Sequence, residues 1–262
     1  MNEALLGHFF PPKAASSPPP WLRPQSSAPP LTKEEIAHAL SKSSSSSAPS
    51  PDGIPYLTWK RVNAIKPSIL LRIRFPLLSL GYHPPSVKGA NGVVLDKPGK
   101  PTFESPSSIR IIVLLRTVST IMDRKIAARL VLAACSRGLI HPNQCGFLHG
   151  LSTYDACLTL MNDVKTLQRP RLKVSALFLD IKAGFDNVDN PTLARILREG
   201  WIPRYLVSCV ASFLRERSCT LVFQGAPGTP APVNVGAPQG SPISPLLFLI
   251  YVLLSTSGSP ED

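Results

Sequence analysis

The spacing of apolar and polar positions along the chain predicts a succession of helices interrupted by a few strands. Apolar residues recur at helical spacing over residues 32–40, where Thr32 and Glu35 form a capping-box pattern. Helical spacing resumes over residues 56–80, where Pro67 is expected to break it. A second break at Pro76 is left open, so two or three short helices are expected there. Further helices are predicted over residues 120–135, from Ser152 onward, over 190–200, over 204–217, and from Ser244 onward.

Two of these helices carry more specific expectations. The helix that begins at Ser152 is expected to turn four apolar side chains inward, those of Leu160, Met161, Val164 and Leu167. In the helix over residues 190–200, Asn190 is the expected N-cap, Pro191 occupies the first helical position and Gly200 is the stop.

Four segments have the pattern of β-strands. Residues 93–95 and 109–115 predict a hairpin with a long basic connection that contains Pro98, Gly99 and Pro101. Residues 173–180 are apolar on both faces, which is typical of a central strand. A last strand is expected over residues 219–223, before a turn rich in Gly and Pro.

Composition and charge add a leader and a basic region. The first 50 residues contain nine Pro and eleven Ser, so we expect a mobile leader there. Residues 61–140 hold 13 basic and three acidic side chains, which account for most of the net charge of +12. Such an excess favours a polyanionic partner such as nucleic acid, although a solvated basic face is the simpler alternative.

Several classes of protein are excluded or disfavoured. The 16 Gly show no triplet period, and five Cys without a C-x-x-C spacing do not suit a disulfide scaffold. The longest apolar run, residues 246–254, is nine residues long, against about 20 for a membrane span. No signal peptide opens the chain, so an intracellular location, nuclear or cytoplasmic, is expected.

Two segments carry candidate chemistry at the ends of predicted elements. Asp180 follows the strand over residues 173–180 and is followed by Phe185 and Asp186. Asp180 could coordinate Mg²⁺ above a sugar-binding floor made by Phe185, or it could be an ordinary turn residue. Gln239 lies in a Gly- and Pro-rich bend that could let the backbone approach a ligand, or could be a plain turn.

Two further segments could bind phosphates. Lys97, Lys100 and Arg110 bracket the predicted hairpin, where they could hold a triphosphate or be solvated cations. The segment over residues 143–156 pairs a Gly-containing loop with a helix start, which could accept a phosphate or could simply be well capped.

The order of these motifs along the chain is more specific than any one of them. Six segments follow one another: SPDGI at 50–54, LDKPGK at 95–100, SSIRIIVLL at 107–115, NQCGFLHGLSTYDA at 143–156, LFLDIKAGFDNV at 177–188 and GAPQGSPISPLLFLIYV at 236–252. In this order they resemble the reverse transcriptase domain of non-LTR retrotransposons, particularly the fungal kind, over residues 32–252.

The resemblance implies an α+β right-hand polymerase fold. Residues 51–170 would form a fingers-like region and residues 171–262 a partial palm, after a leader over residues 1–50. The implied reaction is RNA-templated addition of deoxynucleoside triphosphates to a DNA primer 3′-hydroxyl by two-metal phosphoryl transfer. The partners would be an RNA template and a DNA primer.

The resemblance also implies roles for individual residues. Asp180, with the backbone carbonyl of Ile181, would bind catalytic Mg²⁺. Phe185 would exclude a ribose 2′-hydroxyl. Lys97 and Arg110 would hold the triphosphate, and Gln239 and Gly240 would contact the incoming nucleotide and the template.

The sequence departs from the family pattern in ways that bear on activity. The family's second metal-binding element, an aromatic-x-Asp-Asp hairpin, is not found in the 11 residues after Tyr251, and no thumb follows. Ile111 also stands where many relatives have Pro. We therefore expect a truncated or decayed copy without primer extension on its own. The alternatives are a non-enzymatic RNA- or DNA-binding remnant, and an unrelated basic α/β module, which would lack a strand at Asp180 beside the helix from Ser244.

Overall fold

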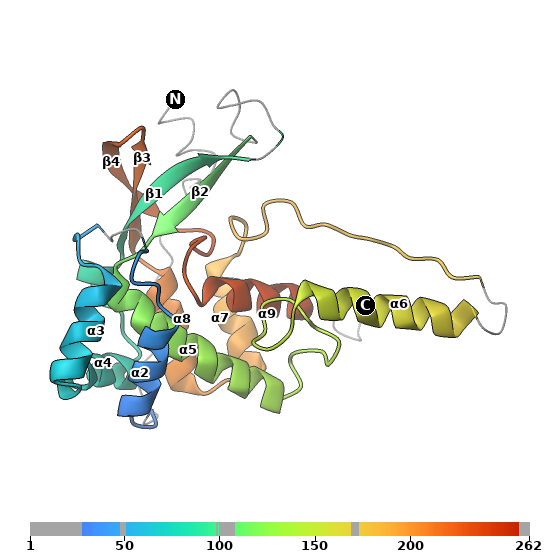
Figure 1. The fold of residues 1–262 in the computed structure, drawn as a ribbon, viewed down its shortest axis with the longest axis horizontal. Coiled ribbons are helices and arrows are strands. Elements are labelled where there is room, and N and C mark those ends of the chain that lie inside the picture. Colours follow the sequence, from blue (N-terminus) through green and yellow to red (C-terminus); the bar gives the residue numbers. More distant parts are fainter. Residues whose placement is uncertain (1–27, 48–50, 98, 100–107, 169–172, 257–262) are drawn as a thin grey trace.

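The computed structural model describes residues 28–47, 51–97, 99, 108–168 and 173–256, and Figure 1 shows their arrangement. Residues 1–27 and 48–50 of the expected leader over residues 1–50 lie outside the described residues, as do residues 98 and 100–107 of the hairpin connection. The described helices are α2 (Lys33–Ser41), α3 (Tyr56–Ile65), α4 (Ser68–Leu80), the short 3-10 helix η2 (Pro85–Val87), α5 (Thr117–Ser136), α6 (Thr153–Gln168), α7 (Asn190–Glu199), α8 (Arg204–Leu214) and α9 (Ser244–Thr256). The described strands are β1 (Gly89–Asp96), β2 (Ile109–Leu114), β3 (Arg217–Phe223) and β4 (Ala226–Val233), so the predicted α+β class is confirmed.

The four strands form one sheet in the order β2-β1-β3-β4. β1 and β2 pair antiparallel, with Val93 opposite Ile112, which confirms the predicted hairpin. β3 joins this hairpin through a parallel pairing with β1, in which Gly92 lies opposite Leu221. Strands separated by more than a hundred residues in the sequence thus become neighbours, a pairing that local pattern does not predict.

The edge strand β4 is an element that the sequence analysis missed. Its residues Pro227, Pro230 and Pro232 were read as part of a turn, because Pro cannot donate to a strand ladder. β4 nevertheless pairs antiparallel with β3, with a register irregularity between Thr220 and Val222. Edge strands tolerate Pro because one side of the strand needs no hydrogen-bond donor.

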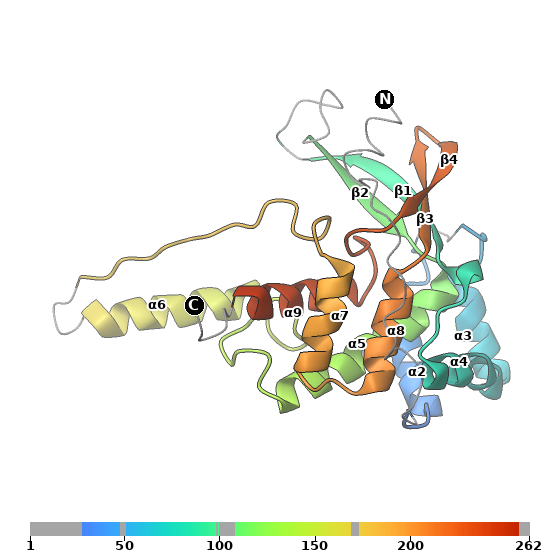
Figure 2. The ribbon, with the colours of Figure 1, turned by 180° about the vertical axis from the view of Figure 1, so that it is seen from behind.

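The helices other than α6 gather below the sheet, as both views of the fold show (Figures 1 and 2). The main core joins β2, α5, α7, α8 and α9 through fully buried side chains such as Leu130, Leu197, Val210 and Leu247. A smaller core joins α2, α3 and α4 to α5, and its buried members are Ile36, Ala39, Leu40, Tyr56, Leu70 and Ile121. Among the described helices none is long and apolar enough to cross a membrane.

Most helix boundaries lie close to the residues that the local signals predict. The main difference is at the C-terminal end of α8. Pro67 separates α3 from α4 as predicted, and α4 continues through Pro76, so residues 56–80 form two helices. The helix predicted over residues 204–217 ends at Leu214, and Arg217 already begins β3.

The N-cap of α7 lies one residue earlier than predicted. The Asp189 carboxylate accepts a hydrogen bond from the Thr192 amide at 3.0 Å. Asn190, the predicted cap, is buried, and its side-chain amide donates to the carbonyl oxygens of Leu214 and Asn234. Asn190 therefore ties the start of α7 to the end of α8 and to the segment after β4.

The prediction for the inner face of α6 is wrong. Leu160, Met161 and Leu167 are exposed, and Val164 is only half-buried. Figures 1 and 2 show that α6 projects away from the other helices. The helical spacing correctly predicted an amphipathic helix, but it could not show whether the described chain supplies a surface for the apolar face.

The central strand predicted over residues 173–180 is not formed. Residues 173–181 are extended but belong to no strand, and Leu177, Phe178 and Leu179 are each about four-fifths exposed. A strand with two apolar faces needs neighbours on both edges and cover on both faces, and no strand of the described sheet pairs with this segment.

The segment around α2 is fastened to α5, and the predicted capping box is confirmed. The Thr32 hydroxyl accepts from the Glu35 amide at 3.1 Å, and the Glu35 carboxylate accepts from the Thr32 amide at 3.0 Å. Arg129 of α5 binds the same carboxylate through two hydrogen bonds of 3.1 and 2.9 Å, and it also donates to the carbonyl oxygens of Pro29 and Pro30. Burial opposes ionisation of Glu35, but the hydrogen bonds from Arg129 and Thr32 lower its pKa.

We expect Arg129→Met to lower the free energy of unfolding by about 1–3 kcal/mol, because it removes charged hydrogen bonds and leaves Glu35 partly buried. Since the pKa of Glu35 is lowered in the folded state, its contribution is present above the unfolded pKa and is lost as the pH falls through the folded pKa. Urea unfolding of the wild type and the variant at neutral and acidic pH measures this. The difference between the two should shrink on acidification, whereas Arg137→Met, at the exposed end of α5, should have little effect at either pH.

Candidate active site

The bend that precedes α9 is fixed against β2. The Val113 amide donates to the Gln239 carbonyl oxygen at 2.6 Å, so the backbone of the bend meets the hairpin directly. Gly240 has φ +128°, and a Cβ built there would lie within 3.0 Å of the Val113 carbonyl oxygen. A glycine is therefore required at position 240 by both the backbone conformation and the close approach.

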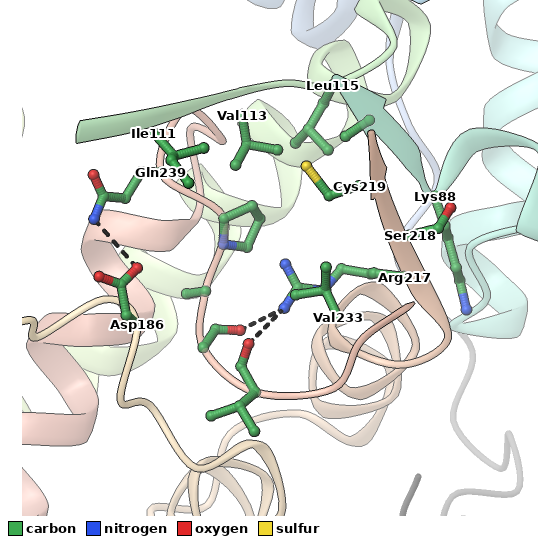
Figure 3. A pocket seen from close by; sticks show the side chains of 15 residues that line it. Lys88, Ile111, Val113, Leu115, Asp186, Arg217, Ser218, Cys219, Val233 and Gln239 are labelled. Carbon is green, nitrogen blue, oxygen red and sulfur yellow. Dashed lines mark hydrogen bonds between the residues drawn. The ribbon is translucent and has the colours of Figure 1, made fainter. Parts of the chain in front are cut away.

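The turn after Asp180 packs against the same bend. The Ala237 amide donates to the Phe185 carbonyl oxygen at 2.8 Å, and the Gly236 amide donates to the Val188 carbonyl oxygen at 3.0 Å. The Gln239 side-chain amide points toward the Asp186 carboxylate, 3.5 Å away (Figure 3). The two motifs that carry most of the family resemblance are thus joined by hydrogen bonds, although they are about 50 residues apart.

Phe185 is held in place by two other aromatic rings. Its ring lies 5.0 Å from that of Phe248 in α9, at an interplanar angle of 33°, and 6.2 Å from Phe147 in an edge-on arrangement. A Cβ at position 184 would come within 2.5 Å of the Phe248 ring, so Gly184 allows this approach. The structure therefore brings the loop around Phe147 to the turn around Phe185 and to α9.

A buried polar cluster, Asp123 with His83 and Ser241, connects the bend to α5. The Asp123 carboxylate lies 3.2 Å from the His83 ring nitrogen Nε2, and it accepts from the Ser241 hydroxyl at 3.5 Å. All three residues are buried, and Asp123 is 0% exposed. The sequence analysis missed this cluster, and the available signal was an aspartate between the apolar positions Met122 and Ile126 of α5.

A small pocket lies between the sheet and the segment that leads into the bend (Figure 3). Its cavity volume is about 30 Å³, room for one or two waters. Arg217 closes one end and donates to the carbonyl oxygens of Gly236 at 2.5 Å and Val235 at 3.4 Å. Burial lowers the pKa of Arg217 to about 10.

Lys88 also lines this pocket, and its ammonium group lies 3.9 Å from the Glu216 carboxylate. Burial lowers the pKa of Lys88, and Glu216 counteracts that shift. The pocket is too small for a nucleotide, and its buried cation Arg217 is bonded to main-chain carbonyls. The pocket therefore has a structural role, because Arg217 joins β3 to the start of the bend through these hydrogen bonds.

The remaining predicted site residues lie at the periphery of this arrangement. Arg110 is exposed on β2, opposite Leu95 in the register, and Lys97 follows the end of β1. Asp180 and Ile181 are exposed on the unpaired segment. The structure therefore joins Phe185, Gln239 and Gly240 in one place and leaves Asp180 outside the packed part of the site.

The N-terminus of α6 is capped by side chains of its own segment. The Asp155 carboxylate accepts from the Ser152 hydroxyl at 2.6 Å and from the Ser152 amide at 2.7 Å. These hydrogen bonds lower the pKa of Asp155. Of the two alternatives for residues 143–156, the capped helix start is the one that the structure forms.

No group of three or more His, Cys, Asp or Glu side chains in the described residues is arranged to hold a metal ion. A single exposed carboxylate, that of Asp180, does not fit two cations about 4 Å apart. The described residues in this arrangement therefore do not fit a two-metal site.

The segment that contains β2, the turn at Phe185 and the bend at Gln239 and Gly240 matches a protein-family model. Residues 95–254 match the model for reverse transcriptase (RNA-dependent DNA polymerase). This match covers more than half of the chain, and the chain therefore belongs to the reverse transcriptase family.

The chain is similar in sequence to polymerases of transposons and other mobile elements. It is 30% identical over 217 residues to a probable RNA-directed DNA polymerase from transposon X-element of Drosophila melanogaster, covering 83% of this chain and 24% of the relative. It is 30% identical over 223 residues to the RNA-directed DNA polymerase from mobile element jockey of the same fly, covering 84% and 24%. The chain thus spans about a quarter of the length of these relatives.

These matches exclude the alternative of an unrelated basic α/β module. The structural criterion proposed for that alternative, the lack of a strand at Asp180, is met because residues 173–181 form no strand. The criterion was wrong, since family membership follows from the matched sequence and does not depend on whether that segment is paired.

Proposed function

We propose that this chain forms the fingers and part of the palm of a non-LTR retrotransposon reverse transcriptase, and that it binds the template, the primer and the incoming deoxynucleotide. The observation that carries the proposal is the meeting of three motifs: β2, the turn at Phe185 and the bend at Gln239 and Gly240. The proposed domain limits are residues 51–170 for the fingers and 171–262 for the partial palm.

In this proposal each residue contributes a distinct contact. Arg110 and Lys97 supply cations for the triphosphate, since a guanidinium binds two phosphate oxygens and an ammonium acts as a point charge. Gln239 offers an amide to a base or sugar edge, and Gly240 lets the backbone approach it. The Phe185 ring, held by Phe248, would limit the space at the sugar 2′ position.

Reverse transcriptases use divalent metal ions, and by the family pattern Asp180 and the Ile181 carbonyl would contribute ligands for Mg²⁺. Because Asp180 is exposed and lacks a surrounding ligand group in the described residues, we propose that this 262-residue chain binds substrates without extending a primer. Nucleic-acid binding without polymerisation is favoured as a second function by the excess of ten positive charges over residues 61–140.

A primer-extension assay tests both parts. We expect the chain to bind an RNA template annealed to a DNA primer in a salt-dependent manner, and to incorporate no deoxynucleotide when Mg²⁺ is supplied. Asp180→Asn should leave the binding unchanged. Mg²⁺-dependent synthesis that Asp180→Asn abolishes would show instead that the chain assembles a working metal site.

Triphosphate binding is tested separately with a fluorescent deoxynucleoside triphosphate. Arg110→Gln should weaken its binding about tenfold, because a charged hydrogen bond contributes about 1.5–3 kcal/mol. Arg72→Gln, an exposed cation on α4, is the matched control and should bind as the wild type does. Equal affinities of the two variants would remove Arg110 from the proposed site.

A further inference from the structure

A second hollow lies at the corner where α7 ends and α8 begins. Its cavity volume is about 440 Å³. Figure 2 shows this corner at the end of α7 and α8 that points away from the sheet and the bend. The lining residues are Arg198, Trp201, Ile202, Pro203, Arg204, Val207 and Ser208.

Trp201 occupies a backbone position that normally belongs to glycine. The Ile202 amide donates to the Leu197 carbonyl oxygen at 3.1 Å, and the Trp201 amide donates to the Arg198 carbonyl oxygen at 3.0 Å. This is the Schellman pattern at a helix C-terminus, in which the residue at position 201 must be left-handed. Trp201 has φ +58°, which is an unfavourable conformation for a bulky side chain.

The Trp201 side chain also gains little from packing, because the residue is 82% exposed. The neighbouring Gly200 has a negative φ and therefore does not use the freedom of a glycine. A glycine at position 201 would form the same corner without strain and without exposing an indole. Backbone strain that is kept at a solvent-facing position is typical of a functional site.

Two arginines line the same hollow as this indole. Arg198 lies in the last turn of α7 and Arg204 is the first residue of α8, and both are exposed. None of the described residues that line the hollow is acidic. The hollow is therefore lined by one aromatic ring and two positively charged side chains.

We propose that this corner binds one nucleotide of a single-stranded nucleic acid, with the base stacked on Trp201 and the phosphate held by Arg198 and Arg204. Aromatic side chains stack on bases regardless of sequence, and arginines bind phosphate oxygens in pairs. The volume lies within the usual range for a small-ligand site, about 300–1,000 Å³. The site is separate from the polymerase site and does not rest on the proposed function.

The decisive variant is Trp201→Gly in the full chain. Glycine suits the left-handed position, so the thermal unfolding midpoint should be no lower than that of the wild type. Affinity for a fluorescein-labelled single strand of about four nucleotides should fall about tenfold, because stacking on one aromatic contributes about 1–3 kcal/mol. The matched control is Gln224→Gly, which relieves a similar left-handed strain (φ +50°) in the exposed β3–β4 turn and should not change the affinity.

Two further measurements test the position and the charge of the site. A strand that carries 5-iodouracil should crosslink to Trp201 on irradiation. The Arg198→Gln, Arg204→Gln double variant should reduce the slope of log affinity against log salt by about 0.7, because the two arginines neutralise one phosphate. Competition by adenosine monophosphate at the same crosslink would identify a free nucleotide as the ligand, and competition by the strand alone would identify a single strand. Unchanged affinity of Trp201→Gly, or crosslinks only outside the corner, would overturn the proposal.

Discussion

Gly240→Ala is expected to lower the free energy of unfolding by about 2–4 kcal/mol and to weaken nucleotide binding at the bend. The added Cβ would lie within 3.0 Å of the Val113 carbonyl oxygen, and this oxygen belongs to the backbone of a paired strand. Relief therefore requires the bend to move away from β2, which lengthens the hydrogen bond from the Val113 amide to the Gln239 carbonyl. Urea unfolding and triphosphate binding measure the two effects.

The matched control is Gly225→Ala in the turn between β3 and β4. Gly225 also has a left-handed backbone, with φ +82°, but nothing lies within 4 Å of a Cβ built there. In this variant the free energy of unfolding should fall only by what a left-handed backbone costs an alanine, about 1 kcal/mol. The variant should bind nucleotide normally. If the two variants lose equal stability, the close approach to Val113 is not what requires glycine at position 240.

Elements whose structure is decided by residues close together in the chain were predictable from the sequence. The capping box of Thr32 and Glu35 is formed with both of its hydrogen bonds. The hairpin of β1 and β2 follows from two apolar runs separated by a Pro- and Gly-containing connection. In each case the residues that decide the structure lie within one short segment, so the pattern contains the necessary information.

Elements whose structure depends on a distant partner were predicted wrongly or missed. The three prolines of β4 indicate a turn unless β3 is known to offer an open edge. Residues 173–180 have the composition of a buried strand, but burial requires neighbours, and the described sheet places none beside them. Periodicity shows which side chains are able to be buried and does not show what would cover them.

The candidate site also contains some residues that the sequence predicts and others that it does not. Phe185, Gln239 and Gly240 belong to motifs with specific residue types at short spacing, and the structure joins them. Asp123 has no motif around it, and its two partners lie 40 and 118 residues away in the sequence. Nothing in the sequence pairs these positions, so only the folded chain reveals that the bend is supported from α5.

That support leads to the second large expected effect, which is that Asp123→Ala lowers the free energy of unfolding by about 2–4 kcal/mol. The substitution leaves the His83 ring and the Ser241 hydroxyl buried without their shared acceptor, and unsatisfied buried polar groups are costly. Because Ser241 follows Gly240 directly, we also expect the bend to loosen where it contacts β2.

Two measurements separate this local effect from a general loss of stability. In a double-mutant cycle with Ser241→Ala, the coupling between positions 123 and 241 should exceed about 0.5 kcal/mol, as is usual for residues in one hydrogen-bonded network. Hydrogen exchange at the Val113 amide, which donates to the Gln239 carbonyl, should accelerate more in Asp123→Ala than in Arg129→Met. Arg129→Met is a suitable comparison because it weakens the attachment of α2 to α5, away from the bend. Equal acceleration in both variants would mean that Asp123 stabilises the fold as a whole and does not position the bend.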